Sequence, residues 1–168
     1  MKQIPLTQGQ FAIVDDKDYK SLSKHKWCYN SSHGATRIIT IKEWRKNRKK
    51  NYGSQISMHR EIMNPPDNMD IDHINHNRLN NRRKNLRICT RSQNLGNQRP
   101  IRGGSSKFKG VTKSKFRVKK GKYCWIANIC FKGCIRYLGT FENEINAAKA
   151  YNKKAKELFG EFANINTL

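Results

Sequence analysis

Residues 72–94, DHINHNRLNNRRKNLRICTRSQN, gather carboxylate, imidazole, amide and guanidinium groups in one short polar stretch. Hydrolysis of a phosphodiester needs a group that takes a proton from water and a divalent cation that stabilises the charge building on the phosphate and the leaving oxygen. Asp72 offers a hard oxygen ligand suited to magnesium or manganese, and Asn94 can add a second oxygen ligand. His73 has an unperturbed pKa near neutrality, which suits a general base. These residue types therefore match metal-assisted hydrolysis.

The loop inside this stretch is strongly basic. Guanidinium and ammonium groups bind phosphate oxygens and can support a charged transition state. We therefore expect the loop to face a nucleic acid and to bind it through Arg78, Arg82, Arg83 and Lys84.

Short secondary-structure elements are predicted around the loop. MDIDHI (residues 69–74) and NLRIC (85–89) read as strands. The T-x-x-Q spacing at residues 90–93 is typical of a capping box and predicts a helix over residues 91–97. Asn94 would then lie one turn into that helix. The chain thus predicts a strand, a loop, a strand and a helix around the candidate site.

The first 58 residues read as short strands. FAIVDD (11–16) and TRIITI (36–41) are rich in β-branched and aromatic residues, with the turn NSSHG before the second. MHREIMNPP (58–66) reads as a short helix or strand end stopped by its prolines. We interpret this part as a β-rich platform, with the basic segment RKNRKK (45–50) as an added phosphate contact.

Beyond the candidate site the composition changes. Residues 98–106, QRPIRGGSS, lack periodicity and read as a linker. YCWIANICF then alternates between two faces and can turn through Lys132 and Gly133 into CIRYLG, which predicts a hairpin; FKGV and KFRVKK supply one more strand. Residues 142–159 predict a helix that ends before Gly160. Its apolar stripe consists of Ala147, Tyr151, Ala155 and Leu158.

Charge restricts the class of partner. Lys and Arg number 35 against 12 Asp and Glu, a formal net charge of +23 spread along the whole chain. A merely solvated surface explains only a few units of charge, so a polyanion such as nucleic acid is the expected partner.

Five cysteines without a CxxC pair indicate neither a disulfide framework nor a tetrathiolate zinc site. No apolar run approaches the roughly 20 residues of a membrane span, and the N-terminus has no signal-peptide core. We expect an intracellular protein.

Residues 58–94 resemble the HNH endonucleases, specifically the phage and intron-encoded homing endonucleases of the ββα-metal class. The shared motifs are MHR (58–60), DHIN (72–75), NNRRKNLR (80–87) and TRSQN (90–94). The resemblance implies that His73 is the general base and that Asp72 and Asn94 bind one divalent metal ion, magnesium or manganese. It also implies that Asn85 pins the loop through backbone hydrogen bonds. Many members have histidine where this chain has Asn94, and homing members often have asparagine.

Each of these residues also has a purely structural explanation. Asp72 alone could cap a helix or close a turn, and His73 alone could be a hydrogen-bonded surface histidine. The asparagines could fill loops, because Asn favours turns. The ordered set in one stretch favours the functional interpretation. His59 either buttresses the site or packs, and we favour packing; His76 has no assigned role.

Residues 105–166 resemble the APETALA2 or ethylene-response-factor DNA-binding domain. The shared motifs are FKGV (108–111), WIANI (125–129), YLGTF (137–141), AAKAY (147–151) and ANIN (163–166). The resemblance implies a three-stranded antiparallel sheet backed by one helix, with the sheet laid into the major groove of DNA. From the resemblance and the charge, we expect DNA contacts from Lys109, Lys113, Lys115, Asn128, Lys132, Arg136 and Tyr137.

The second resemblance has departures that affect specificity. Arg or Glu occupies several groove-facing positions in the plant domains, where this chain has Thr112, Asn128, Cys130 and Ile135. Without bidentate arginines, sequence discrimination should be weaker, and lysine contacts to phosphate should supply most of the affinity. We expect Trp125 and Phe141 to be core aromatics.

The sequence therefore predicts an α+β chain: a β-rich N-terminal part with a ββα-metal HNH nuclease motif, then a three-stranded antiparallel sheet packed on one helix. The expected domains are 1–97, with the motif at about 58–97, and 107–168, joined by the linker 98–106. The predicted function is a metal-dependent, phage-encoded endonuclease that acts on double-stranded DNA and has no small-molecule substrate. It would nick as a monomer or cut both strands as a dimer.

Two alternatives remain open. One is a non-catalytic DNA-binding regulator or architectural protein with a relic HNH fold. The other is an RNA-binding module, which the sequence supports less, because no RNP-like aromatic pattern or GXXG clamp is present.

Overall fold

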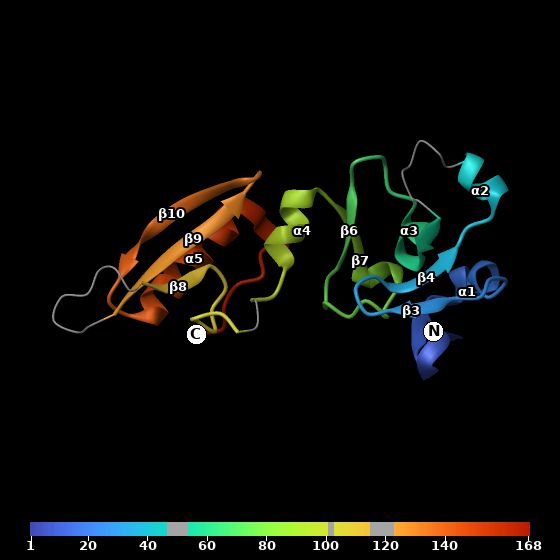
Figure 1. Ribbon diagram of the computed structural model, residues 1–168, viewed down its shortest axis with the longest axis horizontal. Helices are drawn as coiled ribbons and strands as arrows, with labels where there is room; N and C mark the ends of the chain where they lie inside the picture. The colour runs from blue at the N-terminus through green and yellow to red at the C-terminus, as the bar shows by residue number, and fades with distance from the viewer. Residues whose placement is uncertain (47–53, 101–102, 115–122) are drawn as a thin grey trace. The chain divides into compact units, whose positions relative to one another are not determined.

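The computed structural model describes residues 1–46, 54–100, 103–114 and 123–168 as small antiparallel sheets and several helices (Figure 1). Two compact units make up the chain, Met1–Thr90 and Arg91–Leu168. No helix within the described residues combines the length and the apolar character needed to cross a membrane.

Over residues 1–46 and 54–90, the first unit contains three small sheets and short helices. Its elements, with η for 3₁₀ helices, are β1 (Lys2–Pro5), η1 (Thr7–Gly9), β2 (Phe11–Val14), α1 (Asp16–Leu22), β3 (Cys28–Asn30), β4 (Gly34–Ile38), α2 (Ile41–Lys46), β5 (Gln55–Ser57), α3 (Met58–Met63), β6 (Asp70–His73), η3 (Arg83–Asn85) and β7 (Leu86–Cys89). Antiparallel pairing joins β1 to β2, β4 to both β3 and β5, and β6 to β7. Each of the predicted segments FAIVDD, TRIITI, MDIDHI and NLRIC contains a strand. FAIVDD and TRIITI are strand only in part, because α1 begins at Asp16 and α2 at Ile41, and neither helix was predicted.

A cluster of buried apolar side chains joins several elements of the first unit. The N-terminal strands contribute Ile4 and Val14, and the β6–β7 hairpin contributes Ile71 and Leu86 to the same cluster. Burial of such side chains stabilises each by about 1.5 to 3 kcal/mol. The N-terminal strands and the hairpin with the candidate site therefore fold as parts of one unit.

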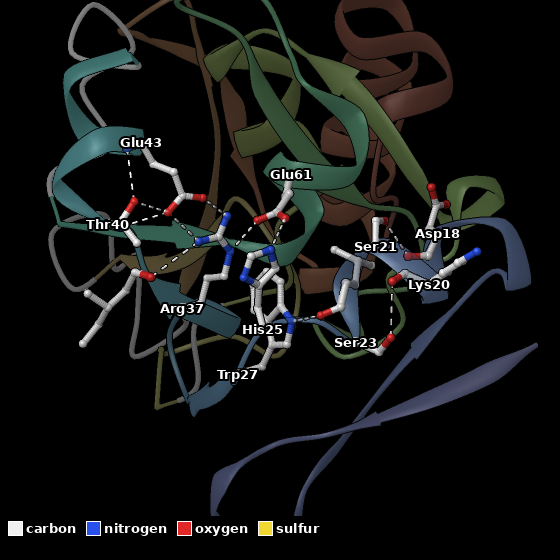
Figure 2. Close-up of polar contacts among 12 residues, drawn as sticks. Asp18, Lys20, Ser21, Ser23, His25, Trp27, Arg37, Thr40, Glu43 and Glu61 are labelled. Atoms are coloured by element: carbon white, nitrogen blue, oxygen red, sulfur yellow. Dashed lines mark hydrogen bonds and ion pairs between the residues drawn. The ribbon is translucent and has the colours of Figure 1, made fainter.

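A buried cation on β4 connects this sheet to three helices (Figure 2). Arg37 is 8% exposed and donates from Nε to Glu61 Oε2 and from Nη2 to Glu43 Oε1, both at 2.7 Å. Its guanidinium carbon lies 5.8 Å from the ring centroid of Trp27. The indole N–H of Trp27 in turn donates to the carbonyl of Leu22, at the end of α1, at 2.8 Å. Two carboxylates thus compensate the charge that burial would otherwise make costly.

In its described residues, the second unit contains one sheet, two α-helices and a 3₁₀ helix. Its elements are α4 (Arg91–Asn97), β8 (Val111–Ser114), β9 (Cys124–Phe131), β10 (Cys134–Phe141), α5 (Glu144–Phe159) and η4 (Gly160–Phe162). The three strands form an antiparallel sheet in the order β10–β9–β8, and α5 packs on one face of it (Figure 1). The predicted hairpin through Lys132 and Gly133 is confirmed, as is the helix that backs the sheet.

Small residues bring α5 close to the sheet. Ala127 on β9 and Ala147 on α5 are fully buried in the same cluster. Gly110 has a positive φ of 72°, and a Cβ there would lie 2.5 Å from the carbonyl oxygen of Asn128 and would overlap the ring of Tyr151. Only glycine fits this position, which explains the glycine of the FKGV motif.

Details of α5 differ from the prediction. The helix begins at Glu144, two residues later than expected, because the Asn143 side chain accepts a hydrogen bond from the Ile145 N–H at 2.7 Å and caps it. Phe159 is buried in the helix where the predicted stripe ended at Leu158, which is only partly buried. The strand expected at KFRVKK falls outside the described residues.

The division into units falls at Thr90–Arg91, earlier than the segment 98–106 that we expected to be a linker. The physical reason is α4, which packs on α5 and η4. The Gly96 carbonyl accepts from the backbone N–H of Asn164 at 3.2 Å. Helix α4 is therefore part of the second unit by its contacts, although its sequence belongs to the HNH-like motif.

The Arg37 cluster predicts a pH-dependent contribution to stability. The Glu43 carboxylate accepts hydrogen bonds from Arg37 and from Thr40, and these bonds, that from Arg37 first, lower its pKa from 4.5 to about 2. Between these values the unfolded chain binds a proton that the folded chain does not, so the stabilisation is complete above pH 4.5 and is lost as the pH falls toward 2.

We expect Glu43→Gln to lower the free energy of unfolding at pH 6, and the gap from the wild type to close as the pH falls through this window. Denaturant titrations of both proteins between pH 2.5 and 7 measure it. Glu142→Gln, which changes an exposed glutamate, is the control. A gap that does not depend on pH would contradict the assignment.

Candidate active site

Asp72 lies near the end of β6, opposite Arg87 on β7. Only 6% of Asp72 is exposed. Its Oδ2 accepts from Arg87 Nε at 2.9 Å and lies 2.8 Å from Arg87 Nη2. Removal of one partner from such a buried pair typically costs about 3 to 5 kcal/mol, because the other charge is left uncompensated. The hairpin register thus places a carboxylate and a guanidinium together.

His73 follows Asp72 and is also buried. Its Nε2 lies 3.3 Å from Oδ1 of Asn81, and its ring meets the ring of His59 edge to face, with centroids 5.1 Å apart. Burial lowers the pKa of His73 from its ordinary value, and the hydrogen bond to Asn81 partly offsets this. A buried imidazole that stays neutral at physiological pH has the lone pair that a base requires.

His59, on α3, is a neighbour of the candidate base. Burial, and next the positive charge of a protonated His73, lowers its pKa to about 3. His59 therefore adds no charge beside His73 at neutral pH. The edge-to-face contact with the His73 ring is the packing that we favoured for His59, and any further role of this residue stays a prediction.

Asn85 connects the two ends of the loop. Its Nδ2 donates to the carbonyl of Asn80 at 2.7 Å, and its Oδ1 accepts from the backbone N–H of Asn75 at 3.1 Å. The backbone carbonyl of Asn85 also accepts from the Ile74 N–H at 2.9 Å. These bonds are of the kind expected for this residue from the sequence; its part in a reaction stays a prediction.

The N-terminal strand β2 holds the other side of the loop. The Ile13 N–H donates to the Leu79 carbonyl, and the Ile13 carbonyl accepts from the Asn81 N–H, both at 2.8 Å. Arg83 forms a bidentate pair with Asp18 at 2.7 and 2.9 Å. The loop is therefore fastened to the platform by backbone and charge.

The basic residues of the loop differ in what they already contact. Arg83 is paired with Asp18, and Arg82 donates from Nε to Asn80 Oδ1 at 3.0 Å. Arg78 is exposed and donates from Nη1 to the Ser31 carbonyl at 2.9 Å. Lys84 is exposed. Arg78 and Lys84 are thus the better placed of the four for phosphate contact.

Asn94, the other expected metal ligand, belongs to α4 in the second unit. The arrangement of β6, β7 and α4 as a ββα-metal site stays a prediction. Within the described residues, no three His, Cys, Asp or Glu side chains come together as a metal site. The donor chemistry still fits a magnesium-type ion, because a carboxylate has about four lone-pair positions and can hold Arg87 and a cation together.

In the second unit, the expected DNA contacts fall on different faces of the sheet. Asn128 pairs directly with Tyr137, and both share the face that α5 does not cover. Lys113 pairs with Trp125, and Arg136 pairs with the buried Ile129. Both basic residues therefore belong to the face of the sheet on which α5 packs. Directly opposed residues share a face. The exposed Lys132 lies in the hairpin turn, and Lys115 falls outside the described residues.

Lys109 is partly buried and has a structural contact that the sequence did not indicate. Its Nζ donates to the carbonyls of Leu95 at 3.0 Å and Gly96 at 2.6 Å, which caps the C-terminal end of α4. Burial lowers its pKa to about 8. Its expected role in DNA binding stays a prediction that now competes with this capping role.

Sequence reasoning missed two further residues near His73 and Asp72. Asn81 was one asparagine in a run of similar residues, and no local signal distinguished it. Arg87 could have been found by aligning the two predicted strands, because that register opposes it to Asp72.

Two comparisons with known proteins indicate the same family. A family model described as HNH endonuclease matches residues 63–95. A protein of Acanthamoeba polyphaga mimivirus, named as an uncharacterized HNH endonuclease, is 32% identical over 167 residues, which cover 96% of this chain and 77% of the relative. No solved structure matches the chain.

The capping contact of Lys109 gives a prediction that separates its two roles. We expect Lys109→Met to lower the free energy of unfolding by about 1 to 3 kcal/mol, because two helix carbonyls lose a charged donor. DNA affinity should fall no more than in Lys149→Met, which changes an exposed lysine of α5. Denaturant titration and fluorescence anisotropy measure the two effects. Unchanged stability with a selective loss of DNA affinity would support the DNA contact instead.

Proposed function

Since this chain belongs to the HNH endonuclease family, we propose that it is a metal-dependent endonuclease that hydrolyses phosphodiester bonds in double-stranded DNA. The observation that carries the proposal is the buried pair of adjacent residues, Asp72 and His73, on a strand inside the matched segment. The loop that follows these two residues is held by hydrogen bonds from the Asn85 side chain. The net charge of +23 supports a polyanionic substrate.

In this proposal His73 accepts the proton of the attacking water. Its neutral state provides the lone pair, and its neighbours hold the ring in place. Asp72 and Asn94 would hold the metal ion, and Arg87 orients the Asp72 carboxylate through its hydrogen bond. Magnesium or manganese bound there would supply Lewis-acid stabilisation of the negative charge on the phosphate and the leaving oxygen. Arg78 and Lys84 bind neighbouring phosphates.

The second unit binds DNA in this proposal and holds the duplex for the first. A three-stranded sheet backed by one helix supports the likeness to the APETALA2 domain. The face with Asn128 and Tyr137, together with Lys132 in the turn, is the proposed contact surface. Its amide and phenol groups offer fewer bidentate contacts to bases than arginines would, so we expect modest sequence selectivity.

The homing type and a phage origin are also parts of the proposal. They rest on the sequence motifs, and the viral source of the relative is compatible with them. The competing function is a DNA-binding protein with an inactive HNH unit. A buried base, a buried carboxylate and a pinned loop all favour the enzyme, because a binding protein has no need of them.

The first test is cleavage itself. Supercoiled plasmid incubated with the protein and magnesium should be nicked or linearised, and a chelator should stop the reaction. His73→Ala should reduce the rate by about 10² to 10⁴-fold, because general-base catalysis is lost. DNA affinity, measured by anisotropy, should stay within about threefold. His33→Ala, at an exposed histidine, is the control. Cutting by His73→Ala at the wild-type rate would refute the base assignment.

The second test concerns the metal. We expect Asp72→Asn to weaken binding of Mn²⁺ by more than roughly tenfold, because a ligand matters at least as much as the groups that orient it. Calorimetric titration with Mn²⁺ measures this in the absence of DNA. Asp70→Asn, two residues earlier in the same strand, is the matched control. Equal Mn²⁺ affinities in all three proteins would remove Asp72 from the metal site.

A further inference from the structure

Asn81 is a fully buried amide in the polar loop between β6 and β7. Its exposed fraction is 0%. Its backbone N–H donates to the Ile13 carbonyl at 2.8 Å. Its side chain lies between the Arg78 carbonyl, 3.4 Å from Nδ2, and the His73 imidazole, 3.3 Å from Oδ1. Burial of an amide is unfavourable unless hydrogen bonds compensate it, so these two partners explain why a polar side chain occupies this position.

The two partners determine which way the amide points. The Arg78 carbonyl can only accept a hydrogen bond, so it must face the NH₂ group of Asn81. The reverse orientation would place two oxygen acceptors against each other. The carbonyl oxygen of Asn81 therefore faces His73 Nε2. Because that oxygen can only accept, Nε2 must carry the proton.

We propose that Asn81 is a positioning residue that holds neutral His73 in the Nε2–H tautomer. The lone pair of the imidazole then lies on Nδ1, and if the proposed function is right, Nδ1 is the atom that accepts the proton from water. A neutral imidazole has one donor nitrogen and one acceptor nitrogen, so fixing the first fixes the second. The wrong tautomer would present an N–H to the water and could not act as a base.

Neighbouring contacts make this arrangement rigid. The ring of His59 meets the His73 ring edge to face, with 5.1 Å between centroids, and limits its rotation. The strand residue Ile13 holds Asn81 through the backbone, independently of the amide. The position of the amide is thus set by the N-terminal strands, and the tautomer follows from the amide.

The direct test is a nitrogen NMR measurement on the metal-free wild-type protein, which requires neither cleavage nor a variant. The chain has five histidines, so a protein labelled with ¹⁵N-histidine gives few signals, and His73→Gln assigns one set. Above the titration range of histidine, Nε2 of His73 should resonate as a protonated, pyrrole-like nitrogen and Nδ1 as a pyridine-like nitrogen. The opposite pattern, or an even mixture, overturns the proposal.

Variants then separate positioning from simple loop support. Asn81→Leu keeps the size but removes the acceptor, so we expect a mixed tautomer and cleavage reduced by about 10- to 100-fold. Asn81→Asp keeps an acceptor toward Nε2, so at a pH where the ring is neutral it should keep the Nε2–H tautomer. Its second oxygen faces the Arg78 carbonyl, so we expect this variant to be less stable than the wild type. Asn80→Ala is the matched control, since this buried neighbour contacts Arg82 and the control should keep the wild-type tautomer.

The outcomes are distinguishable. Retention of a pure Nε2–H tautomer in a folded Asn81→Leu protein contradicts the proposal. If Asn81→Leu does not fold, the wild-type spectrum still decides, because a wild-type protein without the Nε2–H tautomer overturns the proposal. A wild-type protein with the expected tautomer that cuts no DNA would leave the positioning role intact and refute the proposed function alone.

Discussion

The backbone pairing between Ile13 and the loop at residues 79–81 is the constraint on which the rest of the first unit depends. It turns a polar loop, which has little apolar surface of its own, into an extension of the N-terminal sheet. The shared core of Ile4, Val14 and Leu86 holds the hairpin and the strands in one register. A site whose parts must lie within fractions of an ångström needs such support from regular elements. The N-terminal residues therefore help to position the loop precisely.

Charge is managed in two ways within this unit. Arg37, Arg83 and Arg87 each meet a carboxylate and thus act in the architecture of the protein. The excess of uncompensated lysine and arginine remains for the polyanionic partner, where counterion release makes binding sensitive to salt. A count of basic residues alone therefore overstates the surface that can contact DNA, because a cation already hydrogen-bonded to a buried acid contributes little to it.

The sequence predicted the regular elements well where hydrophobic alternation, turn residues or capping residues gave a strong signal. The strands at residues 69–74 and 85–89 and the hairpin of the second unit follow from such patterns, and α4 was predicted with the bounds Arg91–Asn97. Helix α1 was missed because its signal is a run of charged residues after a strand. In the candidate site, the sequence showed which residue types follow one another, but it did not show which residues lie close together in the folded chain. Asn81 acquires its environment from Ile13, 68 positions earlier, and no local pattern encodes that contact.

The tertiary contacts of α4 affect the order in which the parts of the protein fold. This short helix obtains the ammonium of Lys109, the ring of Phe159 and the backbone N–H of Asn164 as partners from residues that follow it in the chain. Helices of this length are marginal in water without tertiary contacts. Domains fold from the N-terminus as synthesis proceeds. On the ribosome, the first unit can thus assemble early, while the helix with Asn94 gains its full support only after Asn164 has been synthesised.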